Sequence, residues 1–276
     1  MSDVTAKLPD TETLVLTQAD HVLHITLNRP KARNAMSLVM VQELMTTFES
    51  IQNDESIRAV VLRGAGGHFC AGGDIKDMAN ARMAMSQKKE GADDPFYALN
   101  REFGKMISYA NQIPQVLIVV TEGAVLGGGF GLACISDVAL SLDDAQFGLP
   151  ETGLGIPPAQ IAPFVVNRIG LTQARRLALL GARFKGDQAE KLGIVHESHA
   201  SESELNDALE KVLEQVKRCA PAANRVTKAL ILAVGQEPID QLLDGAAKSF
   251  AAAVQGPEGQ EGTMAFMQKR TPKWAE

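Results

Sequence analysis

Two glycine-rich turns each follow a short apolar stretch, and their backbone amides could hold a negatively charged oxygen. The first turn reads GGHFCAGGDIKDM after AVVLRGA, and the second reads EGAVLGGGFGLA after VLIVV. Ligands of α/β proteins bind at the carboxyl ends of strands, where the first amides of a helix lack intrahelical acceptors. Two such amides that converge on one carbonyl oxygen would form an oxyanion hole. For either turn alone, glycines that merely permit tight packing are an equally good explanation.

A carboxylate lies beside a third glycine-rich turn. The stretch QFGLPETGLGIPPAQ places Glu151 after a predicted strand, among apolar residues. Apolar surroundings would raise the pKa of this carboxyl, which suits a general acid or base. Considered by itself, Glu151 is also compatible with a capping or surface role. The sequence contains no phosphate loop, no dinucleotide-binding fingerprint and no serine nucleophile motif.

Alternating strand and helix patterns predict the elements that position these residues. Apolar and polar residues alternate over 13–30, which predicts a hairpin that ends at Pro30. Helical spacing over 36–54 predicts a helix that Ser37 caps. Three apolar runs predict further strands; they cover 57–66, 114–128 and 137–150. Strands that alternate with helices predict an α/β core with a largely parallel sheet.

Helical patterns dominate the second half of the chain. They begin near Gln160, and we expect a core over 1–200 and a helical appendage over 201–276. Residues 78–94 have mixed polarity without a clear period. This segment is expected to form a mobile helix or loop over a site, or a solvated connection.

Composition and charge exclude several classes of protein. The 276 residues carry a net charge of −6, which argues against a nucleic-acid partner because phosphate binding needs clustered cations. No apolar run approaches the length of a membrane span, and no signal peptide is evident. Three widely spaced cysteines predict neither disulfides nor a metal site. We therefore expect a cytoplasmic protein without a membrane or nucleic-acid partner.

Five ordered segments make the chain resemble the crotonase superfamily of enoyl-CoA hydratases and isomerases. These segments are ITLNRPKARNAMS, FCAGGDIKDM, EGAVLGGGFGLACISDVALSLDD, AQFGLPETGLGIPP and ARRLALLGARFKGDQAEKLGIV. The resemblance implies an α/β fold, a crotonase-like spiral of ββα units with a C-terminal helical trimerisation region. It also implies a homotrimer or homohexamer whose ligand is an acyl-CoA thioester. The CoA and acyl site would then lie in the core over 1–200, and the helical region over 201–276 would mediate oligomerisation. No metal or separate cofactor is implied, because coenzyme A is carried as part of the substrate.

The same resemblance implies roles for individual residues. Gly73 and Gly128 match the two amides that hold the thioester oxygen and stabilise the enolate. Glu151 matches the catalytic acid or base. Other residues match the CoA site. The loop along the CoA phosphates and pantetheine corresponds to Lys31, Ala32 and Arg33, and the adenine pocket corresponds to Ala71, Asp74 and Ile75. The helix residues that reach a neighbouring subunit's CoA correspond to Phe266 and Lys269.

One departure from the family pattern affects the reaction. Typical hydratases carry a second glutamate where this chain has Gly131, so only Glu151 remains. A single carboxylate could activate water as a hydratase does, or it could move a proton between carbons as an isomerase does. A scaffold that binds acyl-CoA without catalysis is a further alternative.

The stretch GLPETGLGIPPAQIAPFVVNRIG resembles the branch that hydrates 3-methylglutaconyl-CoA or isohexenylglutaconyl-CoA in leucine and acyclic terpene breakdown. Under this hypothesis, Gly131 makes room near the β-carbon for a substituent. A long acyl tail would need an apolar channel, and a substrate carboxylate would need a basic partner. The candidates for the channel wall are Met78, Met83 and Met85, which would equally well pack a helix against the core. The candidates for the basic partner are Arg82, Arg101 and Arg168.

Overall fold

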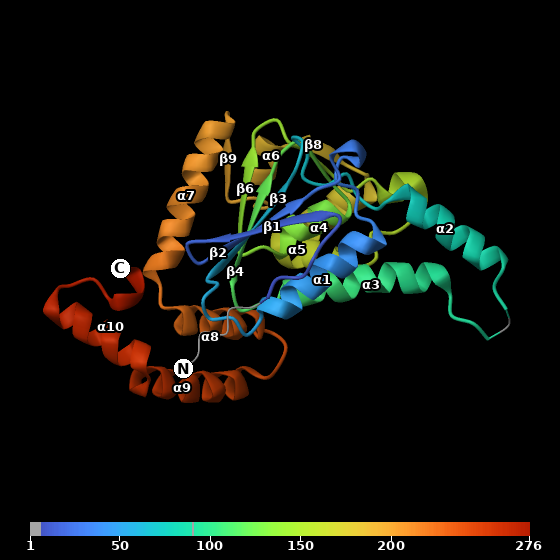
Figure 1. Ribbon diagram of the computed structural model, residues 1–276. Coiled ribbons are helices and arrows are strands. Elements are labelled where there is room, and N and C mark those ends of the chain that lie inside the picture. The colour runs from blue at the N-terminus through green and yellow to red at the C-terminus, as the bar shows by residue number, and fades with distance from the viewer. Residues whose placement is uncertain (1–6, 90) are drawn as a thin grey trace.

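The computed structural model describes residues 7–89 and 91–276, and its main sheet has the strand order β1-β2-β3-β4-β6-β9 (Figure 1). Within this sheet only β1 and β2 pair antiparallel, as the predicted hairpin, and every later pair is parallel. The strands are β1 (Leu14–Ala19), β2 (Val22–Leu27), β3 (Ala59–Gly64), β4 (Val116–Thr121), β6 (Val138–Leu142) and β9 (Glu197–His199). The prediction of a largely parallel α/β core is therefore confirmed.

A second, smaller sheet was not predicted. It joins β5 (Ala124–Leu126), β7 (Gln146–Gly148) and β8 (Arg183–Lys185). The apolar run over 114–128 is thus divided between two sheets. The chain turns at Gly123, which has a φ of 50°, and a Cβ there would lie 2.2 Å from the Gly67 carbonyl oxygen. Only glycine fits this turn, and the turn carries the chain from the main sheet to the small one.

Helices pack on one face of the main sheet and enclose the larger apolar core. The predicted helix is α1 (Leu38–Ile51), and its cap is confirmed because Ser37 Oγ accepts a hydrogen bond of 3.2 Å from the Met40 amide. The others include α3 (Pro95–Ala110), α4 (Gly128–Ile135) and α5 (Ala162–Leu179), while α6 (Gly186–Lys191) is short. Residues 78–94 belong partly to a helix, α2 (Ile75–Ser86), which lies on α3 at one end of the molecule (Figure 1).

The opposite face of the main sheet is covered by α7 (Glu202–Arg218). Leu205, Leu209 and Leu213 are buried there against Val61, Ile118 and other strand residues. The boundary expected at residue 200 therefore falls just before a helix that packs on the sheet.

Three helices extend away from the sheet: α8 (Pro221–Leu232), α9 (Ile239–Gln255) and α10 (Pro257–Gln268). They form the lower left of the molecule in Figure 1, at the opposite end from α2. Short 3₁₀ turns complete the chain at η1 (Pro30–Ala32), η2 (Glu151–Leu154) and η3 (Lys273–Ala275). Among the described residues, no helix has the length and apolar character that crossing a bilayer requires.

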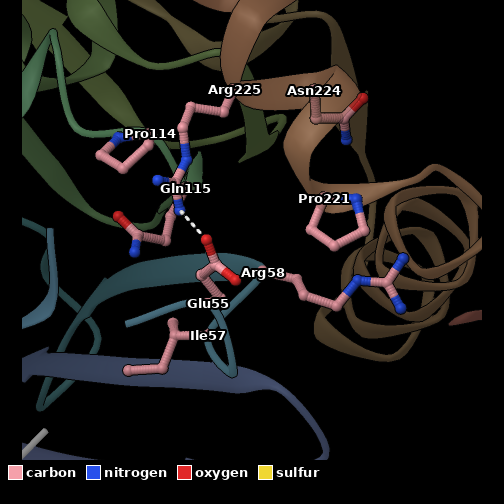
Figure 2. Close-up of a pocket in the computed structure, with 8 residues that line it drawn as sticks. All are labelled: Glu55, Ile57, Arg58, Pro114, Gln115, Pro221, Asn224 and Arg225. Carbon is pink, nitrogen blue, oxygen red and sulfur yellow. Dashed lines mark ion pairs between the residues drawn. The ribbon is translucent and has the colours of Figure 1, made fainter. Parts of the chain in front are cut away.

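Polar contacts fix this helical region to the core. The Arg58 guanidinium donates to the carbonyl oxygens of Trp274 (2.7 Å) and Lys217 (2.6 Å). Lys228 Nζ on α8 lies 2.6 Å from Asp137 Oδ2. Figure 2 shows the small cavity at this junction, where Arg225 of α8 faces Glu55. Two ion pairs, one partly buried and one largely exposed, thus link α8 to the core.

Candidate active site

The two glycine-rich turns lie side by side. The Cys70 amide donates to the Ala124 carbonyl oxygen (2.8 Å), and the Leu126 amide donates back to the Cys70 carbonyl oxygen (2.9 Å). This short parallel bridge continues from β5 into the first turn of α4. Segments more than fifty residues apart in sequence therefore present their backbones to the same region.

Each turn offers an amide without a protein acceptor. Gly128 is the first residue of α4, so its N–H has no partner within the helix. Gly73 lies just before α2 and is exposed. Within 7–89 and 91–276, neither N–H donates a hydrogen bond to the protein. Two unpaired donors on adjacent turns are the components of an oxyanion hole.

The Glu151 carboxylate lies against the second turn. It opens η2, and a Cβ on Gly127 would lie 2.8 Å from Glu151 Oε1 and 3.6 Å from Gly72 Cα. Gly127 has a φ of 51°, a conformation that suits glycine. The carboxylate is therefore brought next to both turns, and this close approach is possible because residue 127 has no side chain.

Burial perturbs the Glu151 carboxyl. Its Oε2 atom is buried, and the described part of the chain supplies it with no hydrogen-bond partner. Burial raises the pKa of Glu151 above its ordinary value of 4.5, and the hydrogen bond that its own backbone offers compensates only in part. A buried carboxylate oxygen without a partner is costly in a purely structural residue. It is therefore available to a water molecule or a substrate.

This raised pKa predicts a pH-dependent difference in stability. The unfolded chain ionises Glu151 near 4.5, whereas the folded chain holds the proton to a higher pH, so the ionised form costs folding free energy. Glu151→Gln is therefore expected to be more stable than the wild type at neutral pH. Urea unfolding at a series of pH values would show this difference shrinking to zero as the pH falls below 4.5. A difference that grows on acidification would contradict the assignment.

The structure corrects the reason proposed for Gly131. A Cβ at this buried position would lie 2.4 Å from Ile161 Cγ2 and 3.1 Å from Ile107 Cδ1. The space expected for a substrate substituent is therefore filled by two isoleucine side chains. They form an apolar wall where typical hydratases would place a second carboxylate.

Gly131→Ala is accordingly expected to destabilise the fold by about 1–3 kcal/mol, because the added methyl overpacks α4 against Ile161. Urea unfolding measures this change. Gly245→Ala is the matched control: Gly245 lies in α9, where a Cβ would meet nothing within 4 Å. That control should be neutral or stabilising by about 0.5–1 kcal/mol, since alanine favours helix. A neutral Gly131→Ala would contradict the packing described.

The loop expected to contact CoA lies beside the first glycine turn. The Ala71 amide donates to the Arg33 carbonyl oxygen (3.0 Å), and Lys31, Ala32 and Arg33 are exposed. Asn34, which the sequence analysis did not single out, holds this loop in place. Its buried side chain donates to the carbonyl oxygens of Ala65 and His68 and accepts from the Arg29 amide, and no local sequence pattern indicates these contacts.

Asp74 and Ile75 differ in their surroundings. Asp74 caps α2, and its two oxygens accept hydrogen bonds from the Lys76 amide (2.8 Å) and Arg29 Nη2 (2.5 Å). Burial opposes ionisation, but these bonds outweigh it and hold the pKa of Asp74 below its ordinary value. Its carboxylate is thus engaged within the protein. Ile75 is 80% exposed and free to contact a ligand.

Phe266 and Lys269 do not lie at this site within one chain. Both belong to the end of α10, which packs on α9, far from α2 and α4 in Figure 1. Phe266 is 86% exposed. Only another copy of the chain could bring these residues to a ligand bound at the glycine turns.

The basic candidates are not equivalent. The Arg168 guanidinium donates to the carbonyl oxygens of Ser136 and Ile194, so it is engaged structurally. Arg82 is exposed on α2, whereas Arg101 is half-buried on α3. Met78, Met83 and Met85 are all exposed on α2. The structure therefore removes Arg168 as a candidate and leaves two arginines.

Neighbouring thiols cannot act as nucleophiles at neutral pH. Burial raises the pKa of Cys70 to about 11 and that of Cys134 to about 12. Glu151 is therefore the ionisable group that this arrangement makes available for acid–base chemistry. With two free amides and one perturbed carboxylate, the site can polarise a carbonyl and move a proton.

Comparison with known proteins gives matches over nearly the whole chain. Residues 17–276 match the family model described as enoyl-CoA hydratase/isomerase. A Marinobacter aquaeolei enoyl-CoA hydratase/isomerase is 64% identical with a TM-score of 0.92, and the match covers 96% of this chain and 99% of that one. Pseudomonas aeruginosa AtuE is 59% identical with the same TM-score, over 96% and 100%. The Escherichia coli 2,3-dehydroadipyl-CoA hydratase is 29% identical over 94% and 97% of the two chains. The expected crotonase-like fold is thereby confirmed.

Proposed function

Because the chain belongs to the enoyl-CoA hydratase/isomerase family, we propose that it adds water across the double bond of a branched, glutaconyl-type enoyl-CoA. The observation that carries this proposal is the buried Glu151 Oε2 atom, which has no hydrogen-bond partner among the described residues and belongs to a carboxylate that lies against Gly127, next to Gly128. The family model and the hydratases among the relatives support a hydro-lyase reaction.

In the proposed reaction, the thioester oxygen accepts hydrogen bonds from the Gly73 and Gly128 amides. Glu151 takes a proton from water while the water oxygen bonds to the β-carbon, and the electron pair of the double bond moves to form the thioester enolate. The protonated Glu151 then returns its proton to the α-carbon. The carboxylate is regenerated, so one glutamate suffices, and neither a metal nor a separate cofactor is needed. CoA would lie along Lys31, Ala32 and Arg33, with its adenine near Ala71 and Ile75.

The branched substrate is supported by the sequence around Ile161. The stretch GLGIPPAQIAPFVV, which contains Ile161, resembles hydratases of leucine and acyclic terpene breakdown. Ile107 and Ile161 are buried against Gly131, so the position where typical hydratases carry a second glutamate is apolar and closed. The proposed reaction therefore relies on Glu151 alone.

The isomerase alternative uses the same residues differently. Glu151 would remove a proton from one carbon of the enoyl group and return it to another, with no water bound to the product. A non-catalytic acyl-CoA scaffold is the remaining alternative. The perturbed Glu151 favours catalysis over a scaffold, since a binding protein has no use for a buried, unpartnered carboxylate.

We further propose that the protein assembles as a trimer or a hexamer through the helical region over 201–276. The helices and the turn between α8 and α9 expose many large apolar side chains, which monomers rarely leave in contact with water. They include Ile231, Val234, Ile239, Leu243, Phe250, Val254 and Met267. Phe266 and Lys269 would then reach a neighbouring subunit's CoA. A cytoplasmic location is also proposed, in keeping with three unpaired cysteines.

Steady-state kinetics with a panel of thioesters test this function. The panel contains 3-methylglutaconyl-CoA, isohexenylglutaconyl-CoA and crotonyl-CoA. The products are separated and their molecular masses are measured. We expect kcat/KM for a glutaconyl thioester to exceed that for crotonyl-CoA by about tenfold or more. Equal or better turnover of crotonyl-CoA would overturn the branched substrate. Retention on a CoA-affinity resin without turnover of any thioester would favour the scaffold.

A further inference from the structure

A polar cluster on α3 lies next to the apolar wall of the site. Gln160 immediately precedes Ile161, and its Nε2 donates to Asn100 Oδ1 (2.9 Å). Arg101 Nη1 donates to Gln160 Oε1 at 3.3 Å. The Arg101 guanidinium is therefore drawn toward the segment that carries Ile161, rather than extended into solvent.

Gly104 makes this arrangement possible. A Cβ at residue 104 would lie 1.9 Å from Gln160 Oε1 and 2.7 Å from Arg101 Nη1. Both side chains therefore lie directly on the α3 backbone, in the space that any other residue would fill. A glycine in the middle of a helix costs about 0.5–1 kcal/mol, so its use here requires a local reason.

The Arg101 guanidinium has unused donors. Within the described residues no carboxylate lies within 4.0 Å of it, because the adjacent Glu102 pairs with Lys105 (2.6 Å). One long bond to a neutral amide leaves most of its five N–H groups free. A half-buried guanidinium of this kind favours a planar anion, and a carboxylate is its best match.

The cluster borders the site described above. Phe103, two residues from Arg101, would contact a Cβ on Gly128 at 3.2 Å, so α3 passes beside the residue whose amide is proposed to hold the thioester oxygen. Ile107, toward the C-terminal end of α3, is buried against Gly131 and closes that direction. An acyl group that leaves the Gly128 amide toward the N-terminal half of α3 would bring its distal end to Arg101 and Gln160.

We propose that Arg101, held by Gln160 over Gly104, binds a carboxylate at the far end of the acyl group and makes the protein selective for dicarboxylic acyl-CoA thioesters. This inference rests on the proposed function and assigns the residue that recognises its substrate class. Arg101 is then a specificity-determining residue that takes no part in the proton transfers.

Binding of unreactive thioesters tests the inference without turnover. 3-Methylglutaryl-CoA and isovaleryl-CoA share the branched carbon skeleton, and only the first carries a terminal carboxylate. Isothermal titration calorimetry would give the Kd of each with the wild type, Arg101→Gln, Arg101→Lys and Gly104→Ala. Lys105→Gln removes the same charge from the same helix and serves as the matched control.

We expect the wild type to bind 3-methylglutaryl-CoA more tightly than isovaleryl-CoA, and Arg101→Gln to weaken only the former, by about 10- to 100-fold. Arg101→Lys should recover part of this loss. Gly104→Ala keeps the charge but displaces the guanidinium, so it too should reduce the preference. Lys105→Gln should retain it.

An unchanged preference in Arg101→Gln, or a wild type that prefers isovaleryl-CoA, would overturn the inference. Loss of the preference in Arg82→Gln instead would assign the role to α2. Failure of the proposed function has a different signature: the wild type would discriminate between these two analogues and yet hydrate no unsaturated thioester.

Discussion

Replacing Glu151 with glutamine is expected to lower kcat for hydration by about 10²–10⁴-fold, because the amide can neither take a proton from water nor return one to the α-carbon. The substitution preserves the shape of the side chain beside Gly127. Thioester binding should therefore change little, so the loss should appear in kcat and not in KM. Stopped-flow or steady-state absorbance at the enoyl thioester band measures both parameters.

Glu214→Gln is the matched control for this substitution, since Glu214 is an exposed carboxylate on α7. It should leave kcat and KM at wild-type values. If Glu151→Gln retained more than about a tenth of the wild-type kcat, general acid–base catalysis by this residue would be excluded.

The second large effect on activity is expected from the substitution Gly127→Ala. Gly127 contacts the Glu151 carboxylate but takes no part in the reaction. A Cβ at this position would lie 2.8 Å from Glu151 Oε1, so Gly127→Ala must displace the carboxylate or the turn that carries the Gly128 amide. Misplacement of a reacting group by about 1 Å can reduce a rate by about 10²-fold. We expect a loss of that order in kcat, together with lower stability because φ is positive at residue 127.

Gly67→Ala separates these two effects. Gly67 also has a positive φ, of 73°, but a Cβ there would meet nothing within 4 Å. The two variants should therefore lose similar stability in urea unfolding, while only Gly127→Ala loses activity. Equal activity losses would show that backbone strain, and not contact with Glu151, explains the effect.

Local sequence patterns predicted much of the fold. Alternation over 13–30 and the capping serine at residue 37 were sufficient for the hairpin and for α1, because both depend on neighbours in sequence. The division between β4 and β5 was missed, because the apolar run there is continuous. Its cause is a contact between Gly123 and the Gly67 carbonyl, and no local pattern encodes a contact between segments more than fifty residues apart.

The sequence also predicted part of the candidate site. Adjacency of the two glycine turns follows from parallel strands whose carboxyl ends meet, and the structure places Cys70 beside Val125. The interpretation of Gly131 was wrong in its physical cause, since glycine there accommodates Ile161. The contact of Arg101 with Gln160 joins residues 59 positions apart, so the sequence could offer three arginines but could not choose among them.

The most direct test of the account is the mass of the product formed from 3-methylglutaconyl-CoA in D₂O. The account predicts that the wild-type product gains one water and keeps one deuterium on carbon, and that Glu151→Gln forms almost none of it. Deuterium on carbon without added water would contradict hydration and establish an isomerase. Equal hydration by both proteins would show that Glu151 is not the catalytic acid and base.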